Sequence, residues 1–401
     1  MNRDNLDFGN GNIASLFRTM FFPTLIAMMF NSLLNICDGM FVGHGVGSEG
    51  LAAINIVAPM FLVTTGIGLM FGIGASVIAS IRLAEDDVKA ARIIMTQAFA
   101  AGAVIFGVII TMTAMFFRPL LYLAGCSEAL EPLATDYLLW LLPGFFFFYI
   151  QCAGMMLIRL DGSPKTAMAI QITSAALNIF LDWLMVFPLG MGIAGASIAT
   201  SISCVAGGCL VMIYFIRFST TLRFYRLKLS AKSLRLTLRN VGYMARIGFA
   251  TFVTELAIGV MIVTGNYVFM SRLGEDGVAA YSIGCYLFPL IFSLSNAVAQ
   301  SAQPIISFNY GAGQTGRVAK TLRLSLITGA ICGAGVSLTM WLAAPLLAAI
   351  FLPTDTTAFT YAVHGLPLFG LSAVLFSLNI VMIGYYQSIE KAGRSTLYTV
   401  M

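Results

Sequence analysis

Ten apolar stretches run along this chain of 401 residues, and each is long enough to cross a lipid bilayer as a helix. Charged residues make up only 10% of the sequence, against about 25% in a typical soluble domain. We therefore predict an all-α polytopic membrane protein with ten transmembrane helices. Their expected limits are 14–40, 53–80, 93–117, 133–158, 166–187, 192–216, 244–270, 278–306, 319–350 and 359–386.

The basic residues lie almost entirely on one side of the membrane when the loops between these stretches are assigned alternately to its two faces. Only Arg118 and Arg272 fall on the other side. The positive-inside rule places the side rich in Lys and Arg, and with it the N-terminus, in the cytoplasm. We therefore expect a multi-pass protein of the cytoplasmic (inner) membrane. The net charge of +5 reflects this orientation and does not predict a nucleic-acid partner.

Sequence motifs of soluble enzymes do not fit this framework. Residues 45–50 spell the dinucleotide pattern G-x-G-x-x-G, but that pattern requires a preceding strand, and here it forms a short outer loop between two spans. The seven cysteines show no C-x-x-C spacing and are expected to pack as small apolar residues. The sequence contains no nucleophile elbow, P-loop or H-E-x-x-H motif. We expect no enzymatic activity, no catalytic residues and no cofactor.

The two halves of the chain resemble each other. Residues 47–53 (GSEGLAA) match residues 274–280 (GEDGVAA), and Pro119-Leu120-Leu121 matches Pro345-Leu346-Leu347 at nearly the same offset. Both copies of each motif fall on the outer side, so the repeat is parallel and its axis runs along the membrane normal. We predict a 6+6 plan of two six-helix lobes.

This repeat divides the chain into an N-terminal six-helix lobe (1–217), a basic cytoplasmic connection (218–243) and a C-terminal lobe (244–401). The second lobe has only four spans, because the repeat places the start of its fifth helix near residue 392 and the chain ends at Met401. We therefore expect the sequence to be a fragment that lacks the last two helices. A natural protein of ten spans is the alternative.

Three carboxylates, those of Asp38, Asp182 and Glu255, lie deep within otherwise apolar spans. An acid at the bilayer centre costs about 2.5–3.5 kcal/mol on insertion scales. An acid retained there is by default functional and usually belongs to an ion or proton path. This pattern predicts a transporter.

Polar side chains accompany two of these acids in the first lobe. At a rise of about 1.5 Å per residue, Asp38, Asp182 and Thr200 reach a similar depth in the outer half of the membrane. Their oxygens suit a small cation, and a pair of carboxylates can instead share one proton. A structural hydrogen-bond network between the helices is the alternative. The other polar positions are Asn31 and Asn35 on the first helix, and Gln171, Ser174 and Asn178 on the fifth.

In the second lobe, Glu255 has Thr251 one turn before it, and we expect a functional role for this acid. Gln300 and Gln303 form a polar face on the eighth span and are expected to line a central substrate cavity. Helix packing is the alternative role for this face. The first-lobe residues expected in the same cavity are Asn31, Asn35 and Ser174.

Five motifs occur in a specific order and spacing, although each is loose on its own. They are Asn35-x-x-Asp38-x-x-Phe41-Val42-Gly43, Arg159-x-Asp161-Gly162-x-Pro164-Lys165, Asn178-x-x-x-Asp182, Gly192-Ile193-x-Gly195-Ala196-x-Ile198-Ala199-Thr200 and Gln303-Pro304-Ile305-Ile306-Ser307-x-Asn309-Tyr310-Gly311-Ala312. With these motifs, essentially the whole chain resembles the multidrug and toxic compound extrusion (MATE) family. The nearest branch is the bacterial one that contains the DinF-like and MepA-like proteins.

The resemblance implies two lobes around a central cavity that alternates between outward and inward access. It further implies a secondary antiporter that exports small amphipathic or cationic molecules in exchange for Na⁺ or H⁺. The expected partners are these substrates and the lipid bilayer, and we expect a monomer.

The resemblance also assigns roles to single residues. Glu255 matches a second-lobe acid implicated in coupling, and Pro23 matches a proline at which the first helix bends in some members. From the residues alone, Pro23 is either a kink or a first-turn proline. The positions that match the family's proposed cation site, and that would hold Na⁺ if it is the coupling ion, are Asp38, Asn178, Asp182 and Thr200.

Other functions stay open on the sequence alone. A lipid-linked oligosaccharide flippase of a related helical plan would favour a strongly cationic cavity, whereas no Lys or Arg falls clearly inside a span. A membrane enzyme would need His, Cys or paired acids clustered near one interface, which the sequence does not show. A passive channel is not distinguished from a transporter by a static pattern. The substrate and the choice of coupling ion are likewise not determined.

Overall fold

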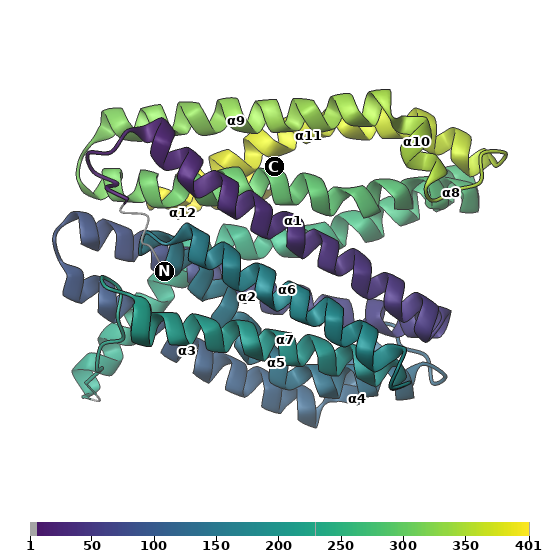
Figure 1. The fold of residues 1–401 in the computed structure, drawn as a ribbon, viewed down its shortest axis with the longest axis horizontal. Helices are drawn as coiled ribbons and strands as arrows, with labels where there is room; N and C mark the ends of the chain where they lie inside the picture. The colour runs from purple at the N-terminus through teal and green to yellow at the C-terminus, as the bar shows by residue number, and fades with distance from the viewer. Residues whose placement is uncertain (1–5, 229, 401) are drawn as a thin grey trace.

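In the computed structural model, which describes residues 6–228 and 230–400, the chain forms two layers of long helices (Figure 1). The helices of the N-terminal half are α1 (Ile13–Gly45), α2 (Ser48–Ala84), α3 (Val88–Met115), α4 (Phe117–Leu123), α5 (Glu131–Leu160), α6 (Pro164–Val186) and α7 (Gly192–Ile213), which continues as the π-helix η1 (Tyr214–Phe218). Those of the C-terminal half are α8 (Ala231–Gly311), α9 (Thr315–Leu342), α10 (Ala344–Ala349), α11 (Thr357–Ser388) and α12 (Ala392–Val400).

The prediction of ten spans is confirmed within the described residues. Ten helices there are long and apolar enough to cross a membrane, and each overlaps one predicted stretch. The assigned helix α8 contains two of them, Ala231–Gly274 and Asp276–Gly311. Gly274 separates the two, because its φ of 66° lies in the left-handed region that favours glycine.

The parallel repeat is visible in the order of the elements. In each half, the third span is followed by a short helix that contains the repeated proline, α4 after α3 and α10 after α9. The repeated glycines that precede the second span of each half, Gly47 and Gly274, both have positive φ values, of 93° and 66°. Helix α12 begins at Ala392, where the repeat predicts a fifth helix of the second lobe. We refer to α2–α7 as the first lobe and to α8–α12 as the second lobe.

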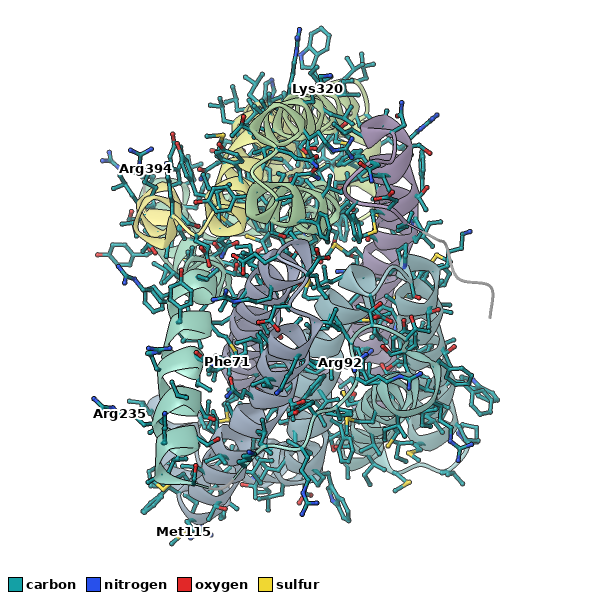
Figure 2. All side chains as sticks on the ribbon, turned by 90° about the vertical axis from the view of Figure 1, so that its left-hand side faces the viewer. Phe71, Arg92, Met115, Arg235, Lys320 and Arg394 are labelled. Atoms are coloured by element: carbon teal, nitrogen blue, oxygen red, sulfur yellow. The ribbon has the colours of Figure 1, made fainter. Side chains whose placement is uncertain are left out.

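One end of the molecule carries most of the basic residues and is called the basic end below. It contains the turns at 85–87, 161–163 and 312–314 and the connection between η1 and α8, and it lies at the left in Figure 1. Figure 2 looks from this end along the helices, with Arg92, Arg235, Lys320 and Arg394 labelled. The loops at the other end join α1 to α2 and α6 to α7.

Helix α1 crosses diagonally between the two layers (Figure 1). Phe17 and Phe21, in its first half, belong to an apolar cluster with residues of α8, α9 and α11. In its second half, Val42 belongs to the core cluster of the first lobe and Phe41 contacts Phe187 at the end of α6. The helix continues without interruption through the buried Pro23. One helix therefore packs against both lobes.

The two lobes approach most closely where glycines of α2 and α8 face the partner backbone. A Cβ atom on Gly248 would lie 1.9 Å from the carbonyl oxygen of Met70, and one on Gly74 would lie 2.1 Å from that of Met244. Small residues let membrane helices pack backbone against backbone in this way. Nearer the basic end, a Cβ atom on Gly311 would lie 2.9 Å from the Cα atom of Ile81.

The connection between the lobes is shorter than the basic segment 218–243 expected from the sequence. Helix α8 begins at Ala231, and the Ser230 side chain caps it by accepting a 3.2 Å hydrogen bond from the amide of Ser233. The basic residues from Lys232 onward therefore lie on a helix. The expectation ended the span at the first charges, whereas charged residues with leucines between them are compatible with a helix that extends past the membrane.

Candidate functional site

Asp38 of α1 lies close to Asp182 of α6, a helix of the first lobe. Asp182 is 0% exposed, and within the described part of the chain neither of its carboxylate oxygens has a hydrogen-bond partner, nor does Oδ1 of Asp38. The two side chains are close enough to interact electrostatically. Buried polar atoms in proteins are nearly always hydrogen-bonded. The Asp38–Asp182 pair is therefore an exception to this rule.

Two neutral side chains with oxygen atoms, those of Asn178 and Thr200, lie near the carboxylates. Asn178, one turn before Asp182 on α6, is buried and donates a 3.4 Å hydrogen bond from Nδ2 to the Thr200 hydroxyl of α7. The structure thus brings the four residues predicted as a cation site onto three adjoining helices. Two carboxylates with an amide and a hydroxyl are hard oxygen ligands, and this set fits a small cation such as Na⁺.

A phenol next to this site was not identified from the sequence. Tyr137 of α5 is buried, and its hydroxyl interacts electrostatically with both Asp38 and Asp182. Buried Tyr hydroxyls usually find a hydrogen-bond partner, and the carboxylates of Asp38 and Asp182 are the candidate acceptors for this one. The sequence signal is weak, because Tyr137 is one of two hydroxyl side chains, with Thr135, near the outer end of an apolar span.

Three of the residues predicted to line the substrate cavity lie on α1 and α6. Asn31 accepts a 3.1 Å hydrogen bond from Gln171, which itself accepts one of 3.2 Å from Gln151. The Ser174 hydroxyl donates to a backbone oxygen of α7, at 2.9 Å, and so joins α6 to α7. The side chain of Asn35 is exposed. Asn31 and Ser174 therefore take part in helix packing, and Asn35 is free to face a ligand.

The two glutamines of the second lobe, Gln300 and Gln303, form a separate group that contacts the first lobe. Gln303 donates a 3.1 Å hydrogen bond to the Ser76 hydroxyl of α2. Both glutamines line a small cavity of about 30 Å³ that also includes Thr251. They lie in the half of α8 that ends at the basic end, whereas Asp38 and Asp182 lie near the opposite end. The structure thus divides the predicted cavity residues between two places.

Gln300 accepts a 2.7 Å hydrogen bond from the guanidinium of Arg159. The predicted span 133–158 ends just before Arg159, but α5 continues to Leu160 and Arg159 is buried in its last turn, where it is 5% exposed. A cation is favoured at a helix C-terminus by the partial negative charge of the last carbonyls. Because hydropathy excludes charged residues from spans, this buried contact between the lobes could not be read from the sequence.

Glu255 lies on the first half of α8, at the face that packs against α2. It is 5% exposed, and a Cβ atom on Gly66 of α2 would lie 3.6 Å from its own Cβ. Thr251, one turn earlier, accepts a 2.8 Å hydrogen bond from Gln387 of α11. The acid is therefore buried between the lobes and apart from the Asp38–Asp182 pair.

Comparisons with known proteins agree with this architecture. Over 294 residues the chain is 26% identical to the multidrug export protein MepA of Staphylococcus saprophyticus, and the alignment covers 71% of the chain but only 63% of that relative. The chain therefore matches less than two thirds of the relative's length. It is also 26% identical over 407 residues to MepA of Staphylococcus haemolyticus, covering 96% of the chain and 84% of the relative.

A solved structure shows the same fold. It is described as the outward-facing conformation of a multidrug resistance MATE family transporter of the MOP superfamily. It superposes with a TM-score of 0.90 at 21% identity, covering 97% of this chain and 86% of that one. The family described as MatE matches residues 23–184 and 251–401. The chain therefore belongs to the MatE family.

Proposed function

We propose that this chain acts in a secondary antiporter that exports organic cations and other amphipathic drugs across the cytoplasmic membrane in exchange for Na⁺ or H⁺. The observation that carries the proposal is the Asp38–Asp182 pair, in which three carboxylate oxygens have no hydrogen-bond partner. An uncompensated buried charge costs several kcal/mol. A bound cation or proton removes this cost. Binding of the coupling ion at this site is therefore favourable.

The position of α1 links this site to the arrangement of the lobes. Asp38 is on the half of α1 that packs against the first lobe, while Phe17 and Phe21 hold the other half on the second lobe. Ion binding that changes how α1 packs therefore changes the relative stability of two lobe arrangements. Such coupling requires that the ion bind the two arrangements with different affinity.

The proposal places the basic end in the cytoplasm by the positive-inside rule. The contacts of Arg159 with Gln300 and of Ser76 with Gln303 join the lobes in the half of the molecule near this end. The described arrangement then corresponds to a cytoplasmic side that is closed. Glu255, buried between the lobes, is assigned the role of a second coupling acid, and the transporter works as a monomer by alternating access.

Transport in vesicles tests this function. The purified chain is reconstituted in liposomes with a fluorescent organic cation, and a Na⁺ gradient or a proton gradient is imposed separately. Movement of the dye against its own gradient is expected under one of the two gradients and identifies the ion. In Asp38→Asn and in Asp182→Asn this movement should be lost, because the amide cannot neutralise a cation.

Asp276→Asn is the matched control, since Asp276 is an exposed acid at the end of the molecule opposite the basic end. This variant should transport like the parent. Uphill transport that persists in Asp38→Asn would reject the proposed coupling site. Dye movement only down its own gradient would indicate a channel instead.

The alternative of a lipid-linked oligosaccharide flippase gains no support from the geometry. Such a protein needs several cations in its central cavity, and Arg159 is the only buried Lys or Arg among the residues that the structure describes. Apart from Arg118 and Arg272, the other basic side chains of the described residues gather at the basic end.

A further inference from the structure

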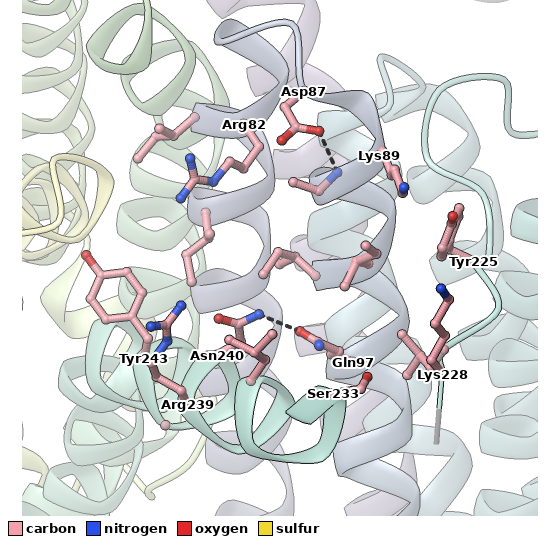
Figure 3. A pocket seen from close by; sticks show the side chains of 18 of the residues that line it. Arg82, Asp87, Lys89, Gln97, Tyr225, Lys228, Ser233, Arg239, Asn240 and Tyr243 are labelled. Atoms are coloured by element: carbon pink, nitrogen blue, oxygen red, sulfur yellow. Dashed lines mark hydrogen bonds between the residues drawn. The ribbon is translucent and has the colours of Figure 1, made fainter. Parts of the chain in front are cut away.

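A large cavity opens at the basic end, outside the region assigned to transport. It has a volume of about 1060 Å³ and lies between the ends of α2 and α3, the first turns of α8 and the connection before α8. Figure 3 shows Arg82, Lys89, Lys228 and Arg239 placed around it. The cavity therefore presents basic side chains from three separate parts of the chain to one space.

Most of the positive charge in this cavity is not neutralised. Arg82 forms a 2.7 Å salt bridge with Glu85, and Asp87 accepts a 2.9 Å hydrogen bond from the amide of Ala90. Glu390 interacts with the hydroxyl of Tyr243. Six further basic side chains line the cavity and take part in no salt bridge within the described part of the chain: Lys89, Arg226, Lys228, Lys232, Arg239 and Arg246.

Two hydrogen bonds of Gln97 fix the floor of the cavity. Gln97 of α3 is 3% exposed, donates a 2.9 Å hydrogen bond to the hydroxyl of Thr237 and accepts one of 2.9 Å from Asn240. These bonds tie the first turns of α8 to α3, and Figure 3 shows the bond between Gln97 and Asn240.

The wall formed by the connection is also fixed. Arg92 donates a 2.7 Å hydrogen bond to the backbone oxygen of Thr221, and the amide of Tyr225 donates one of 2.9 Å to the hydroxyl of Thr96. Asp161 accepts a 2.9 Å bond from the amide of Leu222. These bonds fix the backbone that leads to the next basic residues of the cavity, Arg226 and Lys228.

Exposed leucines accompany the basic residues on α8. Leu234 and Leu238 are one turn apart and are 61% and 65% exposed, and Leu236 lines the cavity itself. A helix with Lys and Arg on one side and Leu on the other is typical of the membrane interface. The cavity thus combines cations with an apolar border, which fits a ligand that has a phosphate headgroup and acyl chains.

We propose that this cavity binds the phosphate headgroup of an anionic phospholipid from the membrane leaflet at the basic end. Arginine forms paired hydrogen bonds with phosphate oxygens, and lysine supplies point charges. Basic pockets between membrane helices attract such headgroups. A bound lipid would join α2 and α3 of the first lobe to α8 of the second lobe, so it stabilises the contact between the lobes at the basic end.

Thermal unfolding in detergent with added lipid tests the proposal. Phosphatidylglycerol should raise the unfolding temperature of the parent chain, and phosphatidylcholine should not. Lys232→Gln combined with Arg239→Gln should weaken the apparent affinity for phosphatidylglycerol about tenfold or more, since each basic residue near an anionic lipid surface contributes substantially to binding. The matched control is Lys320→Gln combined with Arg323→Gln, which removes two exposed charges of α9 near the same end.

A control that loses the lipid effect as fully as the cavity variant would overturn the proposal, because the effect would then come from net charge. An equal rise with phosphatidylcholine would overturn it as well. Inorganic phosphate is tested without lipid. A rise of the same size with millimolar phosphate would assign the cavity to a soluble phosphate and reject the lipid.

Discussion

The guanidinium of Arg159, in the first lobe, donates a 2.7 Å hydrogen bond to the side-chain oxygen of Gln300, in the second lobe. Among the described residues, the only other side chain to which the guanidinium donates a hydrogen bond is Met156, whose sulfur lies 3.5 Å away. A buried cation thus depends on a neutral acceptor that belongs to the opposite lobe. Separation of the lobes at the basic end leaves that cation without its strongest partner.

Gln300→Leu should therefore open the basic end. A hydrogen bond to a charged group is worth about 1.5–3 kcal/mol, which corresponds to roughly tenfold or more in an opening equilibrium. The measurement is the rate at which a membrane-impermeant thiol reagent labels a cysteine placed at Ser76, which is 0% exposed, in a chain without its native cysteines.

Gln387→Leu is the matched control for this prediction. Gln387 bonds to the hydroxyl of Thr251 and to the backbone oxygen of Ile247, both within the second lobe. The Gln387→Leu variant should lower the unfolding temperature without raising the rate of labelling at position 76. Equal labelling rates in the two variants would show that the Arg159–Gln300 bond does not hold the lobes together.

Gly248→Ala should destabilise the protein. The added Cβ would lie 1.9 Å from the Met70 carbonyl oxygen, so α2 and α8 would have to separate. Overpacking of this kind costs about 1–3 kcal/mol. Gly242→Ala in the same helix meets nothing within 4 Å and should leave the unfolding temperature unchanged or slightly higher. Similar unfolding temperatures for the two variants would contradict the close contact.

Asp182→Asn and Asp161→Asn should change stability in opposite directions. Asp182 has no hydrogen-bond partner, so removing its charge relieves an uncompensated buried group. Asp161 accepts bonds from the Tyr214 hydroxyl at 2.6 Å and the Ser219 hydroxyl at 2.9 Å, and the neutral amide cannot replace them all. Thermal unfolding of the ion-free protein measures both. A larger loss in Asp182→Asn than in Asp161→Asn would refute this assignment.

Tyr137→Phe should raise the concentration of coupling ion needed for half-maximal transport, by about fivefold for one neutral hydrogen bond of about 1 kcal/mol. The reason is that its hydroxyl is buried and interacts electrostatically with both Asp38 and Asp182. Tyr149→Phe is the comparison, because that hydroxyl bonds to the backbone oxygen of Ala98 at 2.6 Å. An unchanged ion dependence in Tyr137→Phe would leave the phenol outside the site.

The sequence predicts the spans and the repeat because both depend on local pattern. An apolar stretch of sufficient length must form a helix in the bilayer, and alternation of the loops then fixes which ends lie together. The same reasoning places Asp38, Asp182 and Thr200 at one depth. It therefore anticipates their grouping on adjoining helices, while the role of that group is still a prediction.

Contacts between the lobes could not be predicted in the same way. Hydropathy treats every charge as a boundary, so the predicted span ends at residue 158, just before Arg159, and Lys232 and Arg239 fall in the predicted basic connection. Whether a basic residue faces a partner lobe, a cavity or solvent depends on packing between helices that are far apart in the sequence. The lining of the basic cavity is a property of this packing and has no local signature.

The continuity of α1 limits how the protein can move. Because Phe17 and Phe21 fix one half of this helix to the second lobe and Val42 fixes the other half to the first, a rigid rotation of one lobe must be absorbed within α1. It can be absorbed as curvature at Pro23, where a backbone hydrogen bond is missing, or as sliding of the aromatic side chains. The two lobes therefore have fewer independent motions than two bodies joined only by a flexible connection. Under the proposed function, an ion that binds near Asp38 at one end of α1 would therefore act on the contacts of Phe17 and Phe21 at the other end.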